Sequence, residues 1–333
     1  MSPTEFAQTD TALAFWTVAP GRGEIRPEPP IDPSPHEDLV HVRTCYSGIS
    51  RGTESLVFHG RVPATEYQRM RAPFQSGHLP GPVKYGYASV GLVEAGPAAL
   101  VGRHVFVLYP HQTRYVVPAA AAHVIPDAVP PRRAVLAANL ETAINGVWDA
   151  DVHLGDHVVV IGAGAVGCLA AWLVGRMPGA RVTLVDVNPG RAHIAATLDV
   201  EFASPDEAPS GADVVIHASG NPAGLNTALR SAGDEATVVE LSWYGDAVVP
   251  VSLGAAFHAQ RLTIKSSQVG RVAPAQRARW SPARRMHLAL SLLASPVLDA
   301  LITGETNFAD LPAVMPSLTA VSPGTICHLV RYP

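Results

Sequence analysis

The sequence predicts an α/β protein of two domains, one rich in short β-strands and one built on a doubly wound parallel sheet. Its 333 residues exceed what a single hydrophobic core commonly serves. Short apolar segments bounded by Gly or Pro fill residues 40–117, which is typical of a small β-domain. After Pro131, apolar runs alternate with helical patterns, and this alternation predicts a parallel sheet.

Composition narrows the functional classes. Hydrophobic residues make up 47% of the chain, charged residues 16%, and the formal net charge is −4. Because no basic run has the length of a binding tail, a nucleic-acid partner is not expected. The N-terminus MSPTEFAQTD lacks the features of a signal peptide, and no segment approaches the ~18 apolar residues of a membrane span. We therefore expect a cytoplasmic protein without a membrane partner.

The first domain is predicted from strand-like pieces at both ends of the chain. Residues 20–35 carry six prolines and are expected to form an irregular connection. The strand-like pieces LVHVRTCY, YASVGLVEA, HVFVLY and RYVVP follow. The segment from Leu298 to Tyr332 returns to strand-like sequence with no helical rhythm. We therefore assign residues 1–131 and 295–333 to this domain and residues 132–294 to the other.

The second domain begins with a continuous apolar strand, HVVVI (157–161), as expected for a strand covered on both faces. Apolar residues at helical spacing follow it until Pro178-Gly179, which ends the helix. Further strands are expected at 181–186, 213–219, 237–241 and 261–267, with helices from Pro189 and Pro222 between them.

The strongest motif is Gly162-Ala163-Gly164-Ala165-Val166-Gly167, a G-x-G-x-x-G between that strand and that helix. In this context the first glycine makes a tight turn and the second lets the backbone approach a pyrophosphate. The third glycine lets strand and helix pack closely, and amides at the start of the helix receive the anionic diphosphate. The motif predicts a Rossmann domain that binds a dinucleotide.

Asp186 ends the second strand, 19 residues after Gly167. An acid at this place accepts hydrogen bonds from ribose hydroxyls and repels a 2′-phosphate, which favours NAD(H) over NADP(H). Arg191 follows closely and would tolerate a phosphate or stack on adenine. NAD(H) is therefore the expected cofactor, with NADP(H) as an open alternative.

The order of parts resembles the medium-chain dehydrogenase/reductase superfamily. The segments SGISRGTE (47–54), VKYGYASVGLVEAG (83–96) and FHAQRLTIKSSQVG (257–270) resemble the branch that includes bacteriochlorophyllide-type dehydrogenases. The resemblance implies a GroES-like β-barrel catalytic domain, an inserted Rossmann domain, hydride transfer to a small-molecule substrate, and a homodimer formed through the Rossmann domains.

The same resemblance argues against catalytic zinc. Zinc members of the superfamily hold the metal with a Cys, with the His of a Gly-His-Glu triplet, and with a later Cys, Asp or Glu. Here Ser50 matches the first position, and Tyr87 stands in place of the histidine in Gly86-Tyr87-Ala88. Only Glu141 keeps a zinc-ligating group, since hydroxyl and phenol are poor partners for Zn²⁺. Cys45, Cys168 and Cys327 are too dispersed to form a structural four-cysteine lobe. No metal is expected.

Without zinc, a side chain must polarise the substrate carbonyl and transfer the proton. Tyr87 is the first candidate, and Lys84 would lower its pKa if the two approach. The alternative is that Tyr87 only fills the space left by the metal. Thr53 matches a proton-relay hydroxyl, and His111 lies where the resemblance places a strand near the active cleft. Glu141 needs either a cation such as Arg51 or Lys84, or a role as acid or base.

Two further groups complete the candidate site. Ser219, Gly220, Ser267 and Gln268 follow Rossmann strands and are expected to line the cofactor site. Residues 58–84 form a long loop that holds Arg61, Arg69, Arg71 and Lys84. Such a loop suits an active-site lid over an anionic or ring-shaped substrate, or it is a solvated loop.

Three functions follow from these predictions. The first is an NAD(H)-dependent, zinc-free alcohol dehydrogenase or ketone reductase acting on a polar or cyclic metabolite. The second is a zinc-free enoyl or quinone reductase that uses NADPH, against which Asp186 argues. The third is a non-catalytic NAD-binding sensor.

Overall fold

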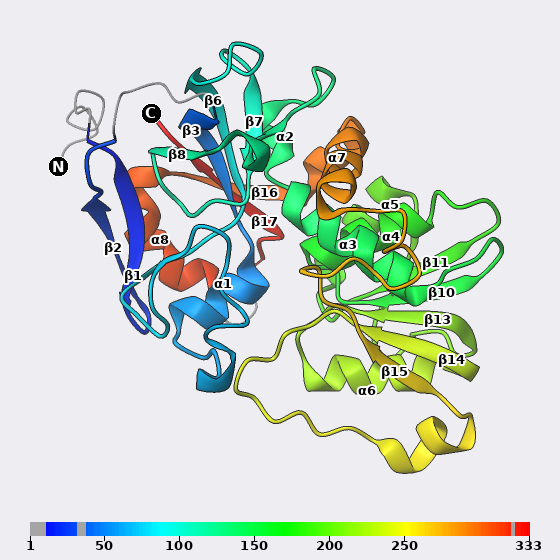
Figure 1. Cartoon of the computed structure of the whole chain (residues 1–333). Helices are drawn as coiled ribbons and strands as arrows, with labels where there is room; N and C mark the ends of the chain where they lie inside the picture. Colours follow the sequence, from blue (N-terminus) through cyan, green and yellow to red (C-terminus); the bar gives the residue numbers. More distant parts are fainter. Residues whose placement is uncertain (1–10, 32–37, 321–323) are drawn as a thin grey trace. The chain divides into compact units, whose positions relative to one another are not determined.

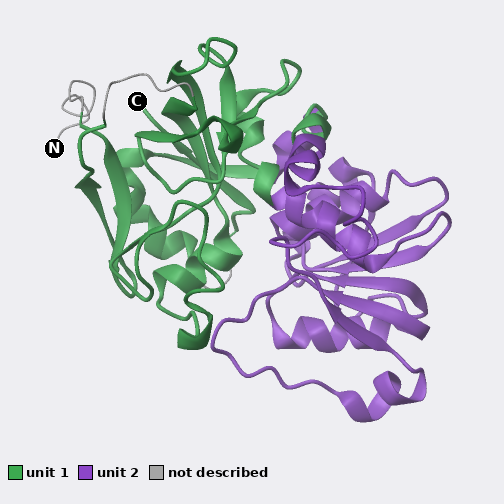
Figure 2. Cartoon of the chain, in the orientation of Figure 1, with its two compact units in different colours: residues 1–138, 290–295, 302–333 green, residues 139–289, 296–301 purple. Residues whose placement is uncertain are grey.

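The computed structural model describes residues 11–31, 38–320 and 324–333. The N-terminal decapeptide, on which the prediction of no signal peptide rests, and residues 32–35 of the proline-rich stretch lie outside these ranges. The chain divides into two units (Figure 2). Unit 1 comprises Met1–Ala138, Leu290–Ser295 and Ile302–Pro333, and unit 2 comprises Asn139–Ala289 and Pro296–Leu301.

The described part of unit 1 contains two sheets. The larger has the order β16-β17-β3-β6-β7-β9, with β8 also paired to β3. Its strands are β3 (Leu39–Ile49), β6 (Ser89–Ala95), β7 (His104–Val107), β8 (Arg114–Pro118), β9 (His123–Val124), β16 (Ile302–Asn307) and β17 (Cys327–Arg331). The smaller has the order β2-β1-β5-β4. Its strands are β1 (Leu13–Ala19), β2 (Arg22–Pro27), β4 (Ser76–Gly77) and β5 (Val83–Lys84).

Chain segments far apart in sequence build the core of unit 1. Strand β17 pairs antiparallel with β3, with His328 opposite Ile49. One apolar cluster joins Phe15, Ile49 and Phe58 to Phe308, Leu311 and Val330. The C-terminal segment therefore completes unit 1 by contributing both strand pairing and core side chains.

Two sequence-based expectations for this unit are wrong. Strand β2 occupies part of the proline-rich stretch expected to be irregular, because Arg22–Pro27 pairs with β1 in a hairpin. Helix α8 (Leu311–Leu318) lies in the C-terminal stretch expected to lack helices. Its Leu311, Met315 and Leu318 are buried at spacings of four and three, which put them on one helix face. Helices α1 (Arg51–Phe58) and α2 (Pro131–Ala134) also belong to this unit.

Unit 2 is a six-stranded parallel sheet among its described residues, with the order β12-β11-β10-β13-β14-β15. Its strands are β10 (His157–Ile161), β11 (Arg181–Val185), β12 (Glu201–Ala203), β13 (Ala212–His217), β14 (Ala232–Glu240) and β15 (Thr263–Ser266). The order reverses between β10 and β13. A reversal of this kind leaves a crevice at the carboxyl ends of the strands, where ligands bind in doubly wound sheets.

Helices cover both faces of this sheet. Figure 1 shows α6 on one face and α4 and α5 on the other. The helices are α3 (Ala137–Ala150), α4 (Ala165–Val174), α5 (Ala192–Leu198), α6 (Pro222–Ser231) and α7 (Pro282–Leu292). Shorter helical turns are Ala64–Glu66, Ala119–Ala121, Pro189–Arg191, Leu253–Phe257, Pro296–Leu301 and Phe308–Asp310. None of the helices among the described residues is long and apolar enough to cross a membrane.

Candidate functional site

The glycine loop of unit 2 has the geometry that the motif predicts. Gly162 has φ +104°, and a Cβ there would lie 2.7 Å from the backbone of Ser219. A Cβ on Gly167 would lie 1.9 Å from the carbonyl oxygen of Gly162, so this position requires glycine for close packing. At Gly164, the N-cap of α4, a Cβ would meet nothing within 4 Å. The backbone is therefore open to a ligand at the start of the helix, and the loop fits a dinucleotide pyrophosphate.

Asp186 follows β11 and is tied to this loop. One carboxylate oxygen accepts a hydrogen bond from the Ala163 amide at 2.6 Å, and the other accepts from the Asn188 amide at 2.8 Å. A carboxylate offers about four lone-pair sites, so acceptor capacity is left for ribose hydroxyls. Arg191, at the end of the turn after β11, is 8% exposed.

The other residues expected to line the cofactor site make contacts within unit 2. Ser219 and Gly220 are exposed beyond the end of β13, with the Ser219 hydroxyl 2.6 Å from His217 Nε2 and the Gly220 amide donating to Ser242. Ser267 donates its hydroxyl to Asp149 at 2.7 Å. Gln268 accepts from the Gly270 amide at 2.8 Å. The side chains of Ser267 and Gln268 are therefore occupied by contacts within unit 2.

In unit 1, folding brings Tyr87 together with Ser50 and Thr53. The hydroxyl groups of both residues hydrogen-bond the phenol of Tyr87. Thr53 lies in the first turn of α1, which begins directly after Ser50. Gly86, with φ +134°, packs against the His111 ring, because a Cβ there would lie 3.1 Å from it.

The environment keeps the phenol protonated. Burial raises the pKa of Tyr87 to about 12, and the negative charge of Glu54 adds to this, while the Ser50 and Thr53 hydroxyls oppose it. The expectation that Lys84 lowers this pKa is wrong. The Lys84 ammonium donates to Glu28 at 2.5 Å and to Gln112 at 2.6 Å. The positive charge of the buried Lys84 is therefore paired with Glu28 and Gln112.

A buried polar chain lies beside Tyr87. His111 Nε2 lies 2.8 Å from Glu54, and its Nδ1 lies 2.7 Å from the Ser47 hydroxyl. The Ser47 hydroxyl lies 3.0 Å from that of Tyr332. Both ring nitrogens of His111 are therefore engaged, one with a carboxyl group and the other with a hydroxyl. Burial is the main cause of the raised pKa of Tyr332, which therefore keeps its proton.

Glu141 pairs with a cation, Arg285. It lies on α3 and accepts from Arg285 Nε at 3.1 Å, with both side chains almost fully buried. The cation is Arg285 of α7, which the sequence did not single out, while Lys84 pairs with Glu28. Burial raises the pKa of Glu141, and the Arg285 charge and hydrogen bond oppose that rise. Arg285 also donates to Asn145 at 2.5 Å, so the pair belongs to a network within unit 2.

The donors at the three positions that the resemblance matches to zinc ligands do not fit zinc. Ser50 and Tyr87 offer a hydroxyl and a phenol that hydrogen-bond each other, and Glu141 is held by Arg285. Zinc prefers thiolate, imidazole or carboxylate. Among the residues that the structure describes, no group of three His, Cys, Asp or Glu is placed to hold a metal ion.

Two of the four cations in the segment 58–84, which includes β4 and β5, have partners within that segment. Arg69 pairs with Glu66 at 2.9 Å, and Arg71 donates to the carbonyl oxygens of Gln75 and Gly77 at 2.7 and 3.2 Å. These contacts and the burial of Lys84 weaken the sequence-based prediction of an anionic substrate.

Sequence reasoning missed several residues of these networks. Glu54 lies four residues after Ser50 and was not among the predicted site residues, yet it is 2% exposed and contacts His111. His217 and Glu240 are the last residues of β13 and β14. A polar residue ending an apolar strand of a parallel sheet was the available signal, because such ends meet at the ligand-binding edge.

Comparison by sequence identifies dehydrogenases that are similar to part of this chain. No family model matches the chain. It is 29% identical to D-guloside 3-dehydrogenase of Escherichia coli K12 over 184 residues, which are 51% of this chain and 53% of that protein. The chain thus spans about half the length of the curated relatives it matches first. Sugar and polyol dehydrogenases are among these relatives.

Solved structures match over nearly the whole chain. A protein of Escherichia coli CFT073, described as a short-chain alcohol dehydrogenase complexed with NADH, has a TM-score of 0.74 at 18% identity. A Sinorhizobium meliloti dehydrogenase bound to NADP has a TM-score of 0.75 at 19% identity. Each match covers 97% of this chain and 100% of the other. The chain therefore shares the α/β fold of these two dehydrogenases, with a parallel six-stranded sheet among its described residues.

Proposed function

We propose that this protein is a nicotinamide-dependent oxidoreductase that interconverts a secondary alcohol and a ketone of a polar or cyclic metabolite. The observation that carries the proposal is the glycine loop, in which Gly162 and Gly167 fit only as glycines and Gly164 is open. The cofactor would supply hydride chemistry, with Gly162–Gly167 and Asp186 holding it. Because Arg69, Arg71 and Lys84 are engaged, we favour a neutral polyhydroxylated substrate.

Within this proposal, Tyr87 supplies the proton in ketone reduction. Its phenol, with a pKa of about 12, stays protonated near neutral pH and can donate a hydrogen bond to a carbonyl oxygen. An alkoxide is a stronger base than a phenolate, so the proton moves to the product as charge develops. Thr53 and Ser50 hydrogen-bond the phenol and would stabilise the phenolate until it is reprotonated.

A test by substrate class separates this proposal from its alternatives. NADH and NADPH absorbance is followed with matched panels of polyol-derived ketones, enones and quinones. We expect turnover with ketones and with the corresponding alcohols in the reverse direction. Turnover with enones or quinones alone would favour the reductase alternative. Cofactor binding without turnover on any panel would favour the NAD-binding sensor.

We predict tighter binding of NADH than of NADPH, by about tenfold, because the Asp186 carboxylate would face the 2′-phosphate. Fluorescence titration of both cofactors measures this ratio. Asp186→Ser should weaken NADH binding and bring the ratio close to one. The control Asp234→Ser removes an exposed acid of the same unit and should leave the ratio unchanged. An NADPH preference in the unmodified protein would contradict the assignment.

We also predict that the purified, dialysed protein contains no stoichiometric zinc, because Ser50 and Tyr87 hydrogen-bond each other and Glu141 pairs with Arg285. Elemental analysis before and after incubation with excess zinc checks this. One zinc per chain that survives dialysis would show that other residues supply ligands. Activity should also be insensitive to a chelator.

The remaining parts of the proposal concern assembly and location. We propose that the enzyme acts in the cytoplasm and forms a homodimer through unit 2. The sheet of this unit ends at β12 and β15 among the described residues, and an open sheet edge invites pairing.

A further inference from the structure

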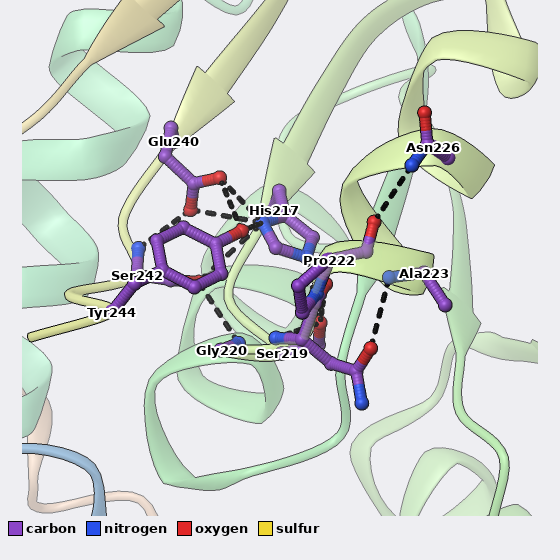
Figure 3. Close-up of polar contacts among 10 residues, drawn as sticks. His217, Ser219, Gly220, Pro222, Ala223, Asn226, Glu240, Ser242 and Tyr244 are labelled. Carbon is purple, nitrogen blue, oxygen red and sulfur yellow. Dashed lines mark hydrogen bonds and ion pairs between the residues drawn. The ribbon is translucent and has the colours of Figure 1, made fainter. Parts of the chain in front are cut away.

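Five polar residues meet where β13 and β14 end, and we call them the edge cluster (Figure 3): His217, Ser219, Glu240, Ser242 and Tyr244. His217 Nδ1 lies 2.8 Å from both carboxylate oxygens of Glu240, and its Nε2 lies 2.6 Å from the Ser219 hydroxyl. The Tyr244 hydroxyl donates to Glu240 at 3.0 Å, and the Ser242 amide donates at 2.7 Å.

These contacts surround the Glu240 carboxyl group with polar partners. The Tyr244 hydroxyl and the Ser242 amide both donate to it, and His217 Nδ1 lies within hydrogen-bond distance of both of its oxygens. Burial and the Glu240 charge raise the pKa of Tyr244, so its hydroxyl keeps the proton that it donates. The ion pairs of the described residues give Glu240 only His217, with no lysine or arginine. The side chain of Glu240 is 12% exposed.

The order Ser219–His217–Glu240 resembles the hydrogen-bonded series of a serine hydrolase, but the burial does not suit acyl transfer. His217 is 0% exposed, so its ring cannot reach a leaving group. The Gly220 amide, which follows the serine, already donates to the Ser242 hydroxyl at 3.0 Å, so it is not free to bind an oxyanion. The cluster is better suited to hold a fixed charge.

The position of the edge cluster in the sheet suggests which part of a bound cofactor the Glu240 carboxylate would lie near. In a doubly wound sheet each half binds one mononucleotide of a dinucleotide. The glycine loop and Asp186 belong to the half formed by β10, β11 and β12. The other half, with β13, β14 and β15, is left for the nicotinamide mononucleotide, and Glu240 ends its middle strand. An oxidised nicotinamide ring carries a positive charge, whereas the reduced ring is neutral.

We propose, on the basis of the proposed function, that the Glu240 carboxylate, oriented by His217 and Tyr244, favours the oxidised nicotinamide cofactor over the reduced one. Glu240 is then a positioning charge that sets the relative affinity for the two cofactor forms. It takes no part in proton transfer to the substrate.

The test measures dissociation constants of NAD⁺, NADH and ADP-ribose by calorimetry in the full-length protein. Glu240→Gln should raise the ratio of the NAD⁺ constant to the NADH constant about 3- to 10-fold, as expected from removing one partly screened charge. ADP-ribose lacks the nicotinamide, so its affinity should not change. Glu240→Asp keeps the charge and should stay within about twofold of the original ratio.

A matched control lies on the same strand. Glu235 is exposed and pairs with Arg261. It precedes the regular part of β14, Thr237–Glu240, which alone spans roughly 10 Å. Glu235→Gln should leave the ratio unchanged, because that distance exceeds the screening length of about 8 Å. If Glu240→Gln fails to fold, Glu240→Ala removes the charge without presenting an amide to His217.

The outcomes separate the inference from the function on which it rests. An unchanged NAD⁺ to NADH ratio in Glu240→Gln, with normal binding, would overturn the inference and leave the proposed function standing. Equal losses for NAD⁺, NADH and ADP-ribose would assign Glu240 a structural role and also overturn it. Absence of nicotinamide cofactor binding in the unmodified protein would overturn both.

Discussion

Tyr87→Phe should lower kcat by about 10²–10⁴-fold, the contribution typical of a general acid. The substitution removes only the hydroxyl that Ser50 and Thr53 hydrogen-bond and keeps the ring and its contact with Tyr85. NADH affinity should barely change, because the proposed cofactor residues belong to unit 2. Steady-state kinetics combined with cofactor titration measures both effects.

Tyr115→Phe is the matched control for this substitution. Tyr115 is also a buried, hydrogen-bonded tyrosine of unit 1, and its hydroxyl contacts Ser89 at 3.0 Å. We expect near-normal kcat for this variant. Near-normal turnover in Tyr87→Phe would reject Tyr87 as the proton donor and make His111 the next residue to test. A parallel loss of cofactor affinity would assign Tyr87 a structural role.

Arg285→Met should reduce the stability of unit 2 by about 3–5 kcal/mol, the range found when one partner of a buried ion pair is removed. Arg285 and Glu141 are 2% and 7% exposed, so the remaining carboxylate would be buried without a cation. The loss of donors to Asn145 and Val269 adds to the effect. Urea unfolding followed by tryptophan fluorescence is suitable, since four of the five tryptophans lie in unit 2.

The loss of stability in Arg285→Met should depend on pH in a defined direction. Burial already raises the pKa of Glu141, and Arg285 opposes that rise, so removing Arg285 raises it further. A carboxyl group with a raised folded pKa loses stability as pH rises through that value. The destabilisation should therefore be greater at pH 7 than at about pH 5.

Two further variants identify the cause of the loss. Glu141→Gln in the Arg285→Met background should remove most of the pH-dependent part, because no buried charge is left. Arg261→Met, which breaks an exposed pair with Glu235, should have little effect. A loss independent of pH, and unchanged by Glu141→Gln, would show that packing and the Asn145 contact dominate.

The sequence alone determined the Rossmann half of this protein, because its signals are local. An apolar strand, three glycines at fixed spacing and a helix follow one another within residues 157–174, and each glycine's role depends on backbone sterics over a few residues. The signal of Asp186 is local in the same sense, since this residue directly follows the next strand, β11. The contacts of Gly162 and Gly167 with neighbouring backbone are the consequence of that local pattern.

Only the tertiary structure decided which charged groups pair. Lys84 and Tyr87 are close in sequence, yet Lys84 bonds Glu28, 56 residues away. Glu141 accepts a hydrogen bond from Arg285, which is 144 residues away in the sequence. His111 contacts Glu54, which is 57 residues away. Burying an unpaired charge costs free energy, so each of these charged side chains requires a partner. The tertiary fold determines which residue that partner is. The edge cluster likewise exists because parallel pairing places the ends of β13 and β14 side by side, with His217 opposite Glu240.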